Sequence, residues 1–265
     1  MAGAVALLAD ASASAAALPR VTVSSPAAGR LAVRGAGALK AGVTQITFTT
    51  RRKDATLALF ELRVGVTPEQ LSVALAHAAG PRGVRDLAAL RYAPEIGRGH
   101  EATVYLDLRA GTYVAADVTS STARHAQQTI TVAARTAGTP AAHSPPAGAR
   151  IEMRDFRFAA PARIGRSGIV RYINSGQTFH YADAIRLGAH ASFRKALQAL
   201  RAGRSKVPGS IGFAPLLGLV GPGQTGEARY RLAPGRYVLV CFYADADSHD
   251  RPHTRLGMER AITVR

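Results

Sequence analysis

The chain has 265 residues, of which 47% are hydrophobic and 19% are charged, a composition that excludes a disordered chain and can fill two domain-sized cores. Its formal net charge is +17, yet the basic residues are scattered singly, Trp is absent and only 6% of residues are aromatic, so we expect no specific nucleic-acid binding. The sequence has no run of about 18 apolar residues, which excludes a membrane-spanning helix.

Residues 1–18 are rich in alanine and leucine and contain Ala11-Ser12-Ala13, a small-residue pattern of the kind that a signal peptidase accepts. No basic residue precedes the apolar stretch, however, and Asp10 interrupts it. A low-complexity start without an export role is the alternative. We expect a truncated export signal here, and hence a secreted or cell-envelope protein.

A segment at residues 137–149 divides the rest of the chain nearly in half. Its sequence, AGTPAAHSPPAGA, is rich in proline, glycine and alanine and has no apolar periodicity, which is typical of an interdomain linker. We therefore expect one domain over residues 20–136 and a second over residues 150–265. Each would have about 115 residues, a normal domain size.

The two expected domains carry the same strand pattern. Residues 105–114 alternate apolar and polar side chains, break at a glycine turn and resume in a β-rich run with Tyr113 just after the turn. Residues 230–238 repeat this pattern, with Tyr237 after the turn. Two further pairs of strands correspond: residues 42–48 with 168–174, and residues 129–132 with 261–264. These matches predict a tandem repeat in which the two tyrosines occupy equivalent positions.

Each domain also contains one predicted helix. Residues 67–78 begin with threonine, proline and, three residues after the threonine, glutamine, and then place Leu71 and Leu75 on one face. Residues 191–202 place apolar side chains four and seven residues apart and stop at Gly203. One helix per domain is too few for parallel sheets. The pattern predicts an all-β protein made of two tandem antiparallel Greek-key β-sandwiches, each with one short inserted helix.

Several residues of the second domain carry a family resemblance. The run LAPGRYVLVC forms a strand, a turn and a strand that ends at Cys241, the single cysteine of the chain. Downstream, His253 and Met258 have four residues between them, with glycine directly before the methionine. Upstream, NSGQTFH is an asparagine-containing loop that ends at His180. This combination resembles the cupredoxins, the blue-copper fold, in which such a strand pair delivers a cysteine ligand and such a loop the first histidine.

The resemblance implies a copper site with His180, Cys241, His253 and Met258 as ligands. Two imidazoles, a thiolate and a weak axial thioether suit a copper ion that cycles between two oxidation states. The loop after Cys241 is longer than in most electron-transfer members of the family, and it contains His249 as a rival ligand. We favour His253, because His249 would lose the histidine-to-methionine spacing. Since buried cysteine and methionine are common in cores, a cupredoxin-like scaffold without metal is the alternative.

The first domain lacks these ligands. Matching the turns and glycines places Asp117 opposite Cys241 and Leu57 opposite His180, and no methionine follows. We therefore expect a structural, interfacial or partner-recognition role for this domain.

Three acidic residues of the long loop suggest a calcium site at first sight. The central glycine and closing glutamate of an EF-hand are missing, so we predict a solvated acidic loop. It contains Asp245, Asp247 and Asp250.

The sequence leads to two hypotheses on function. The first is a secreted cupredoxin-like protein that binds one copper ion for electron transfer or copper handling, with a redox or envelope protein as its partner. The second is a metal-free β-sandwich that serves envelope structure or partner binding. No nucleophile elbow, phosphate-binding loop or His-x-His pair occurs, so we predict no catalytic residues and no oxidase chemistry. The sequence leaves the oligomeric state open.

Overall fold

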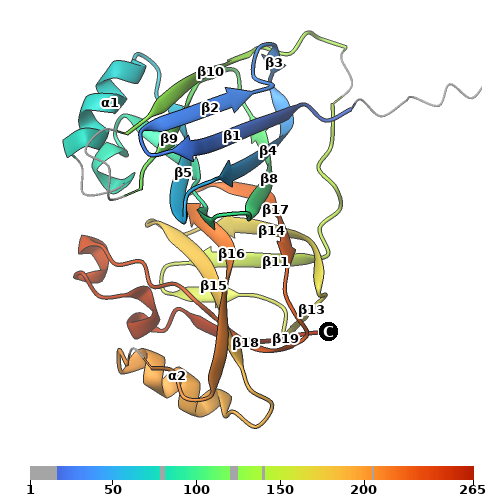
Figure 1. The fold of residues 1–265 in the computed structure, drawn as a ribbon, viewed down its shortest axis with the longest axis vertical. Helices are drawn as coiled ribbons and strands as arrows, with labels where there is room; N and C mark the ends of the chain where they lie inside the picture. Colours follow the sequence, from blue (N-terminus) through green and yellow to red (C-terminus); the bar gives the residue numbers. More distant parts are fainter. Residues whose placement is uncertain (1–16, 78–80, 120–124, 139–140, 205) are drawn as a thin grey trace, which may run out of the picture.

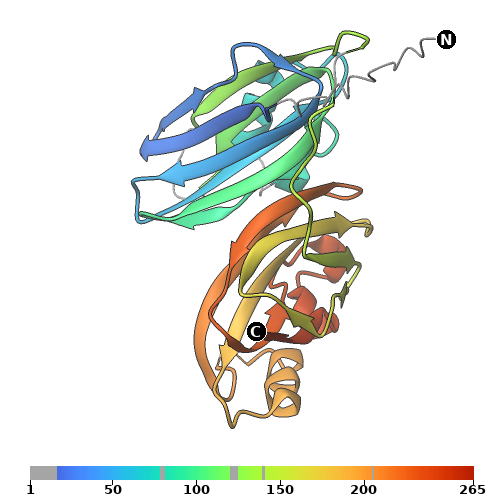
Figure 2. The ribbon, with the colours of Figure 1, turned by 90° about the vertical axis from the view of Figure 1, so that its right-hand side faces the viewer.

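The computed structural model describes residues 17–77, 81–119, 125–138, 141–204 and 206–265. The described chain is mostly β-strand, as predicted. In Figure 1 and Figure 2, the strands of the first half, coloured blue to green, form the upper part of the molecule, and those of the second half form the lower part. The expected export signal lies outside the described residues, apart from its last two positions.

The first half contains strands in two layers, with a helix to one side. Its helical elements are α1 (Pro68–His77) and the short η1 (Pro81–Val84). Its strands are β1 (Arg20–Ala27), β2 (Arg30–Arg34), β3 (Leu39–Lys40), β4 (Gly42–Thr50), β5 (Asp54–Leu62), β6 (Ala88–Tyr92), β7 (Glu95–Gly97), β8 (Glu101–Leu108), β9 (Gly111–Asp117) and β10 (Gln127–Ala133).

The described residues of the expected linker up to Gly148 form no helix or strand, and its last residue, Ala149, begins the first strand of the second half. Its helical elements are α2 (Phe193–Arg201) and the short η2 (Ala246–Ser248) and η3 (His253–Leu256). Its strands are β11 (Ala149–Arg154), β12 (Arg157–Ala159), β13 (Arg163–Ile164), β14 (Ser167–Asn174), β15 (His180–Leu187), β16 (Ser210–Val220), β17 (Thr225–Arg231), β18 (Gly235–Val240) and β19 (Glu259–Val264).

The same pairings occur in both halves. In the first, β1 pairs with β2 antiparallel and with β4 parallel, and β4 pairs with β8 antiparallel. In the second, β11 pairs with β12 and β14, and β14 with β17, in the same directions. The other layer repeats as well, because β10, β9, β5 and β6 follow one another as β19, β18, β15 and β16 do. A short parallel strand, β3 or β13, adds to the outer edge of each such layer.

The two matched tyrosines make the same local contact. Tyr113 and Tyr237 are each the third residue of a strand that begins with glycine, and both are buried. The hydroxyl of Tyr113 donates to the carbonyl of Arg109 at 3.2 Å, and that of Tyr237 donates to the carbonyl of Ala233 at 2.7 Å. Each tyrosine thus fastens its strand to the turn that precedes it.

The halves are joined through a shared sheet, which the prediction of two separate sandwiches did not include. Strands β8 and β17 pair, with Glu227 opposite Tyr105, so that one eight-stranded sheet runs through both halves in the described part of the chain. Tyr92 stacks on Tyr172 at 5.6 Å between ring centroids, and its hydroxyl accepts from the backbone N–H of Gly218 at 2.9 Å. An exposed sheet edge carries unpaired backbone groups, and this pairing removes one such edge from each half.

Both predicted helices are present. In α1, Leu71 and Leu75 are buried, and Thr67 and Gln70 exchange the reciprocal hydrogen bonds of a capping box. Helix α2 is capped by Ser192 and lies at the far end of the second half (Figure 1). In the described part of the chain, no helix is long and apolar enough to cross a membrane.

Candidate metal centre

Cys241 directly follows β18 and is fully buried. The loop after it folds back onto the strand end through backbone hydrogen bonds. Thr254 donates to the carbonyl of Cys241 at 3.0 Å, and His253 donates to that of Tyr243 at 2.9 Å. Met258 in turn donates to the carbonyl of His253 at 3.0 Å. The long loop therefore closes, and it brings His253 back beside Cys241.

His180 is the first residue of β15 and is also fully buried. The loop before it is held by the buried side chain of Asn174. The Asn174 amide donates to the carbonyls of Thr178 and Val220 at 2.8 and 2.9 Å, and its carbonyl accepts from the N–H of Gly176 at 3.0 Å. The asparagine of the predicted loop thus fixes the path of the chain into the histidine.

Three of the four predicted ligands meet at one point. Nδ1 of His180 lies 3.1 Å from Nδ1 of His253, and Sγ of Cys241 lies 3.6 Å from the same His253 nitrogen. The three donor atoms all lie within 4.8 Å of one another, and the three residues are buried. Among the described residues, this is the one such group of histidine, cysteine and carboxylate side chains. Two imidazole nitrogens and a sulfur around one point match the donor set of a trigonal copper site.

The other two candidate ligands, Met258 and His249, lie in different environments. Met258 follows η3, is fully buried and belongs to the same core cluster as Cys241, while its role as an axial ligand stays a prediction. His249 ends η2 in the left-handed conformation, with φ of 53°, and is exposed. The rival histidine therefore lies on the surface, whereas His253 lies beside the cysteine.

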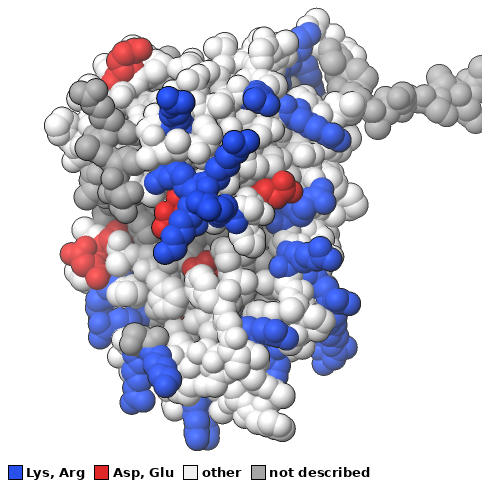
Figure 3. Space-filling view, viewed as in Figure 1, with Lys and Arg blue, Asp and Glu red and all other residues white. Residues whose placement is uncertain are grey.

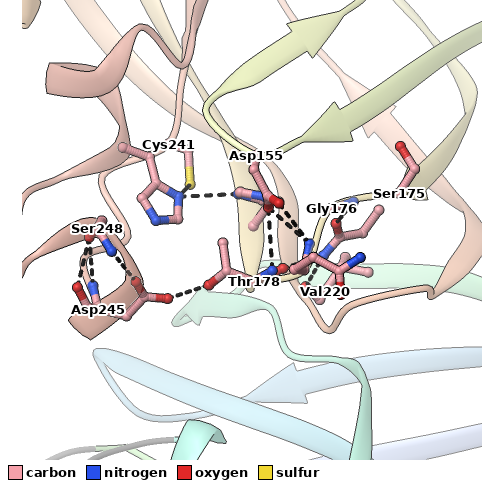
Figure 4. Close-up of polar contacts among 12 residues, drawn as sticks. Asp155, Ser175, Gly176, Thr178, Val220, Cys241, Asp245 and Ser248 are labelled. Atoms are coloured by element: carbon pink, nitrogen blue, oxygen red, sulfur yellow. Dashed lines mark hydrogen bonds and ion pairs between the residues drawn. The ribbon is translucent and has the colours of Figure 1, made fainter.

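The acidic loop is not solvated throughout, so that prediction was wrong for Asp245. This residue is buried and forms a capping box with Ser248, whose N–H donates to the carboxylate at 2.9 Å. Thr178 donates its hydroxyl to the same carboxylate. Asp247 and Asp250 are exposed. Asp245 thus ties the long loop to the loop before His180, and Figure 4 shows these contacts around Cys241.

Asp155, in the turn between β11 and β12, is a residue that sequence reasoning missed. Its carboxylate lies 3.2 Å from Nε2 of His180 and accepts from the N–H of Gln177 at 3.0 Å. A Cβ on Gly176 would lie 2.3 Å from the Asp155 carboxylate, so only glycine allows this approach. No local signal marks Asp155. The parallel pairing of β11 with β14, which sets Met153 beside Asn174, brings it to the histidine.

The same turn reaches the second histidine through Phe156. This residue adopts φ of 61°, which is uncommon for an aromatic side chain, and its ring meets the His253 ring edge-on at 5.0 Å between centroids. Tyr243 contacts His253 from another side at 5.7 Å. One short turn therefore touches both imidazoles, one through a carboxylate and the other through an aromatic ring.

The contacts define a chain of hydrogen bonds. Because a carboxylate accepts, Nε2 of His180 carries the proton that faces Asp155, and its Nδ1 is left as an acceptor. The 3.1 Å contact between the two Nδ1 atoms then requires His253 to donate to His180. Nε2 of His253 is unprotonated in this arrangement, and it has no hydrogen-bond partner among the described residues. His180 thus directs its Nδ1 lone pair into the site, where it accepts the His253 proton.

Burial controls the charge of all three groups. Desolvation lowers the pKa of His180, although the neighbouring Asp155 opposes the shift. It also lowers the pKa of His253 to about 4, with the nearby His180 adding to the effect. The pKa of the Cys241 thiol is raised to about 12, again by burial. At neutral pH both imidazoles are therefore uncharged, as metal ligands must be, and the thiol keeps its proton.

The matching end of the first half is built differently. Asp117 follows Tyr113 by four residues, as Cys241 follows Tyr237, and its side chain is 1% exposed. Its carboxylate pairs with the Arg52 guanidinium at 2.6 Å and accepts from the hydroxyls of Ser25 and Thr119 at 3.1 and 2.5 Å. An ion pair with hydrogen-bonded oxygens thus stands where the second half has its thiol.

Two details of the predicted match need correction. The registers pair Glu61 with Tyr113 and Arg186 with Tyr237, which sets Ala55, not Leu57, at the position of His180. The two-residue difference arises because Gly65 lies four residues after Glu61 whereas Gly188 lies two residues after Arg186, so matching these glycines shifted the strand. A histidine is also present near Asp117, contrary to expectation. Nδ1 of His125 donates to the carbonyl of Asp117 at 2.8 Å.

No family model matches the chain, and no curated protein matches it. The chain is similar to several solved structures. Reduced auracyanin from Roseiflexus castenholzii is 19% identical, with 44% of this chain and 94% of that chain covered and a TM-score of 0.27. Auracyanin A from Chloroflexus aurantiacus, a "blue" copper protein, is 15% identical over 44% of this chain and 98% of that chain, with a TM-score of 0.26.

A third similar structure is a blue copper oxidase from Nitrosomonas europaea. It is 12% identical, with 92% of this chain and 85% of that chain covered and a TM-score of 0.24. Neither the identities nor the TM-scores transfer a function to this chain. The recognition of a cupredoxin-like site therefore rests on the buried histidines and cysteine, in the order that the sequence predicted.

Proposed function

We propose that this chain is a copper-binding protein of the cupredoxin type, whose second half holds one copper ion. His180 and His253 would bind through Nδ1 and Cys241 through Sγ, with Met258 as the weak axial ligand. The observation that carries the proposal is the convergence of the three donor atoms within 4.8 Å in a buried site. A core without a metal site has no need for two adjacent buried imidazoles, since burying polar groups is unfavourable.

The donor set fits copper. Soft thiolate and thioether ligands combined with two imidazoles select copper in a trigonal site, and the ion supplies one-electron redox chemistry when bound. The carboxylate on Nε2 of His180 is the outer partner that ligating histidines commonly have. Uncharged imidazoles at neutral pH support binding further. The Cys241 proton must leave when the metal binds, so we expect loading at pH 7 to release about one proton.

The residues around the ligands keep the site in place and dry. Asn174 and Asp155 orient the loop before His180. The rings of Phe156 and Tyr243 pack on His253 and exclude water from it. A rigid, water-poor site lets a metal change its charge with little rearrangement of its surroundings. This supports an electron carrier or a copper-holding factor.

We also propose that the two halves are tandem cupredoxin-like Greek-key sandwiches joined edge to edge. The repeated pairings and the shared tyrosine contact support this arrangement. The first sandwich, in which Asp117 and Arg52 pair, would serve structure or partner recognition. The composition of residues 1–18 supports a secreted or cell-envelope location.

The test is to add copper(II) to the purified, reduced protein. We expect one equivalent to bind tightly and to produce an intense visible absorption from thiolate-to-copper charge transfer. Zinc uses similar donors but gives no such band, so competition between the two metals reports which one the site prefers. Binding without the band, unaffected by Cys241→Ser and abolished by His249→Ala, would mean that exposed imidazoles hold the metal. The metal-free scaffold would then be the better description.

A further inference from the structure

One part of the second half carries an excess of positive charge. Residues 184–226 contain no Asp or Glu. Helix α2 and its neighbours occupy this stretch, and in the lower part of Figure 3, where α2 lies, the charged side chains in view are basic. The basic residues of the stretch are Arg186, Arg194, Lys195, Arg201, Arg204 and Lys206.

Most of these cations face solvent unpaired. Arg201 is neutralised by Glu259, with Nε 2.6 Å from the carboxylate. Within the described residues, no ion pair involves Arg194, Lys195, Arg204 or Lys206, and all four are exposed. The last two line a surface hollow at the end of α2. Unopposed cations in a cluster attract anionic partners over about one Debye length, roughly 8–10 Å.

An apolar strip borders these cations. Ile211 and Phe213 on β16 are 62% and 60% exposed. Phe213 lies opposite Ile185, which packs with Leu200 of α2 in one apolar cluster. Because cross-strand partners lie on the same face of a sheet, Phe213 is on the face that α2 covers. The helix contacts β18 and η3, and it leaves the strip on the edge strand β16 open.

This surface lies next to the metal ligands. Arg255 of η3, two residues after His253, lies beside Gly203 at the end of α2, because a Cβ on Gly203 would be 3.0 Å from its Nε. The Arg201 ion pair fastens α2 to Glu259, the residue that follows Met258. The ligand loop and the cationic surface are therefore in direct contact.

We propose that this surface docks a partner protein that presents carboxylates around an apolar contact. The proposal rests on the proposed function for the partner's role, which is to exchange electrons or copper with the adjacent site. Protein interfaces typically combine an apolar centre with a charged rim, and complementary charges raise the rate of encounter. The strip supplies the apolar centre, and the four unpaired cations supply the rim. The apolar centre favours a protein over a nucleic acid, whose backbone binds through charge alone.

The test uses the copper-free full chain, so that a failure to bind copper does not decide it. The probes are a fluorescent peptide of alternating glutamate and leucine, a glutamate and serine peptide, and a lysine and leucine peptide. We expect the first to bind best at low ionic strength, the second about tenfold more weakly, and the third not to bind. The double variant R194E/K206E should lose about tenfold in affinity for the first peptide, and Phe213→Thr should lose a similar factor.

The matched control is R30E/R34E, which makes the same change in net charge on β2 of the first half, where both arginines are exposed. This variant should bind the glutamate and leucine peptide as the wild type does. Equal losses in both double variants would overturn the proposal, because net charge alone would then explain binding. A single-stranded DNA oligonucleotide that binds through the same residues and ignores Phe213→Thr would also overturn it, and would point to a general polyanion surface.

Discussion

The two halves share their strand pairings, yet the matching ends of β9 and β18 hold different chemistry. At the end of β18, a thiol and two uncharged imidazoles converge in a buried site. At the end of β9, the carboxylate of Asp117 is neutralised by Arg52 and saturated with hydrogen bonds. The same backbone positions can therefore present a ligand set or an internal ion pair. The comparison indicates that the fold determines where the site lies, and that the identity of a few side chains determines its chemistry.

The largest expected effect comes from Cys241. Cys241→Ser should abolish the visible charge-transfer absorption of the copper-loaded protein, because the band requires sulfur. The matched variant in the first half, Asp117→Ser, should leave the band and the copper stoichiometry unchanged. Absorption spectra during copper titration measure both. A band that survives in Cys241→Ser would refute the ligand assignment.

The next effect concerns stability of the first half. Asp117→Ala leaves the Arg52 guanidinium, which is 14% exposed, without its partner, so the free energy of unfolding should fall by about 3 kcal/mol. Asp86→Ala is the control, since its pair with Arg85 is 3.9 Å long and Asp86 is 94% exposed; that loss should be below about 0.5 kcal/mol. Urea unfolding of the copper-free protein gives both values. Similar small changes in the two variants would contradict a structural role for Asp117.

Much of this picture follows from the sequence. Cap residues and apolar spacing located both helices, and the strand and turn patterns located the tyrosine turns. The family resemblance pointed to His180, Cys241 and His253, which the structure brings together. The residues that sequence missed act across strands. Asp155 reaches His180 because β11 and β14 pair in parallel, and the buried Asp245 accepts a hydrogen bond from Thr178, which lies on a loop distant in sequence. The pairing of β8 with β17 escaped prediction for the same reason, since strand edges that meet across domains leave no local pattern.

Asp155 gives the third prediction, which concerns a positioning residue of the second half. Asp155→Ala removes the acceptor that fixes the His180 ring, so copper affinity should fall by about 10- to 100-fold. Gly176→Ala should act in the same direction, because its Cβ would collide with the carboxylate. Competition with a chromophoric chelator measures the affinities.

The control for this prediction is Asp250→Ala, which removes an exposed carboxylate of the ligand loop. Its affinity should equal that of the wild type. If Asp155→Ala and Asp250→Ala lose the same factor, the effect is one of general electrostatics, and Asp155 has no special role. In the copper-free protein, nitrogen NMR should also show the His180 ring protonated at Nε2, and Asp155→Ala should disturb that preference.

The buried imidazoles of the second half make the stability of the copper-free protein depend on pH. Their pKa values are lowered in the folded state, to about 4 for His253 against a usual 6.5, so the unfolded chain takes up protons first. The stability that the neutral imidazoles contribute to the copper-free protein is therefore fully present above pH 6.5 and is lost as the pH falls towards 4. His253→Leu should weaken this dependence, by on the order of 1 kcal/mol across the window. Unfolding curves at several pH values provide the measurement, and an unchanged slope would argue against a buried, neutral His253.

The smallest expected effect belongs to Met258, the predicted axial ligand. Met258→Leu nearly conserves volume in a buried position, so stability should change by less than about 1.5 kcal/mol. The axial thioether tunes the centre without holding it, so copper and its colour should stay, and the reduction potential should rise. Voltammetry of the loaded variant beside the wild type tests this. An unchanged potential with an unchanged spectrum would make Met258 a core residue, and the centre would then consist of His180, Cys241 and His253 alone.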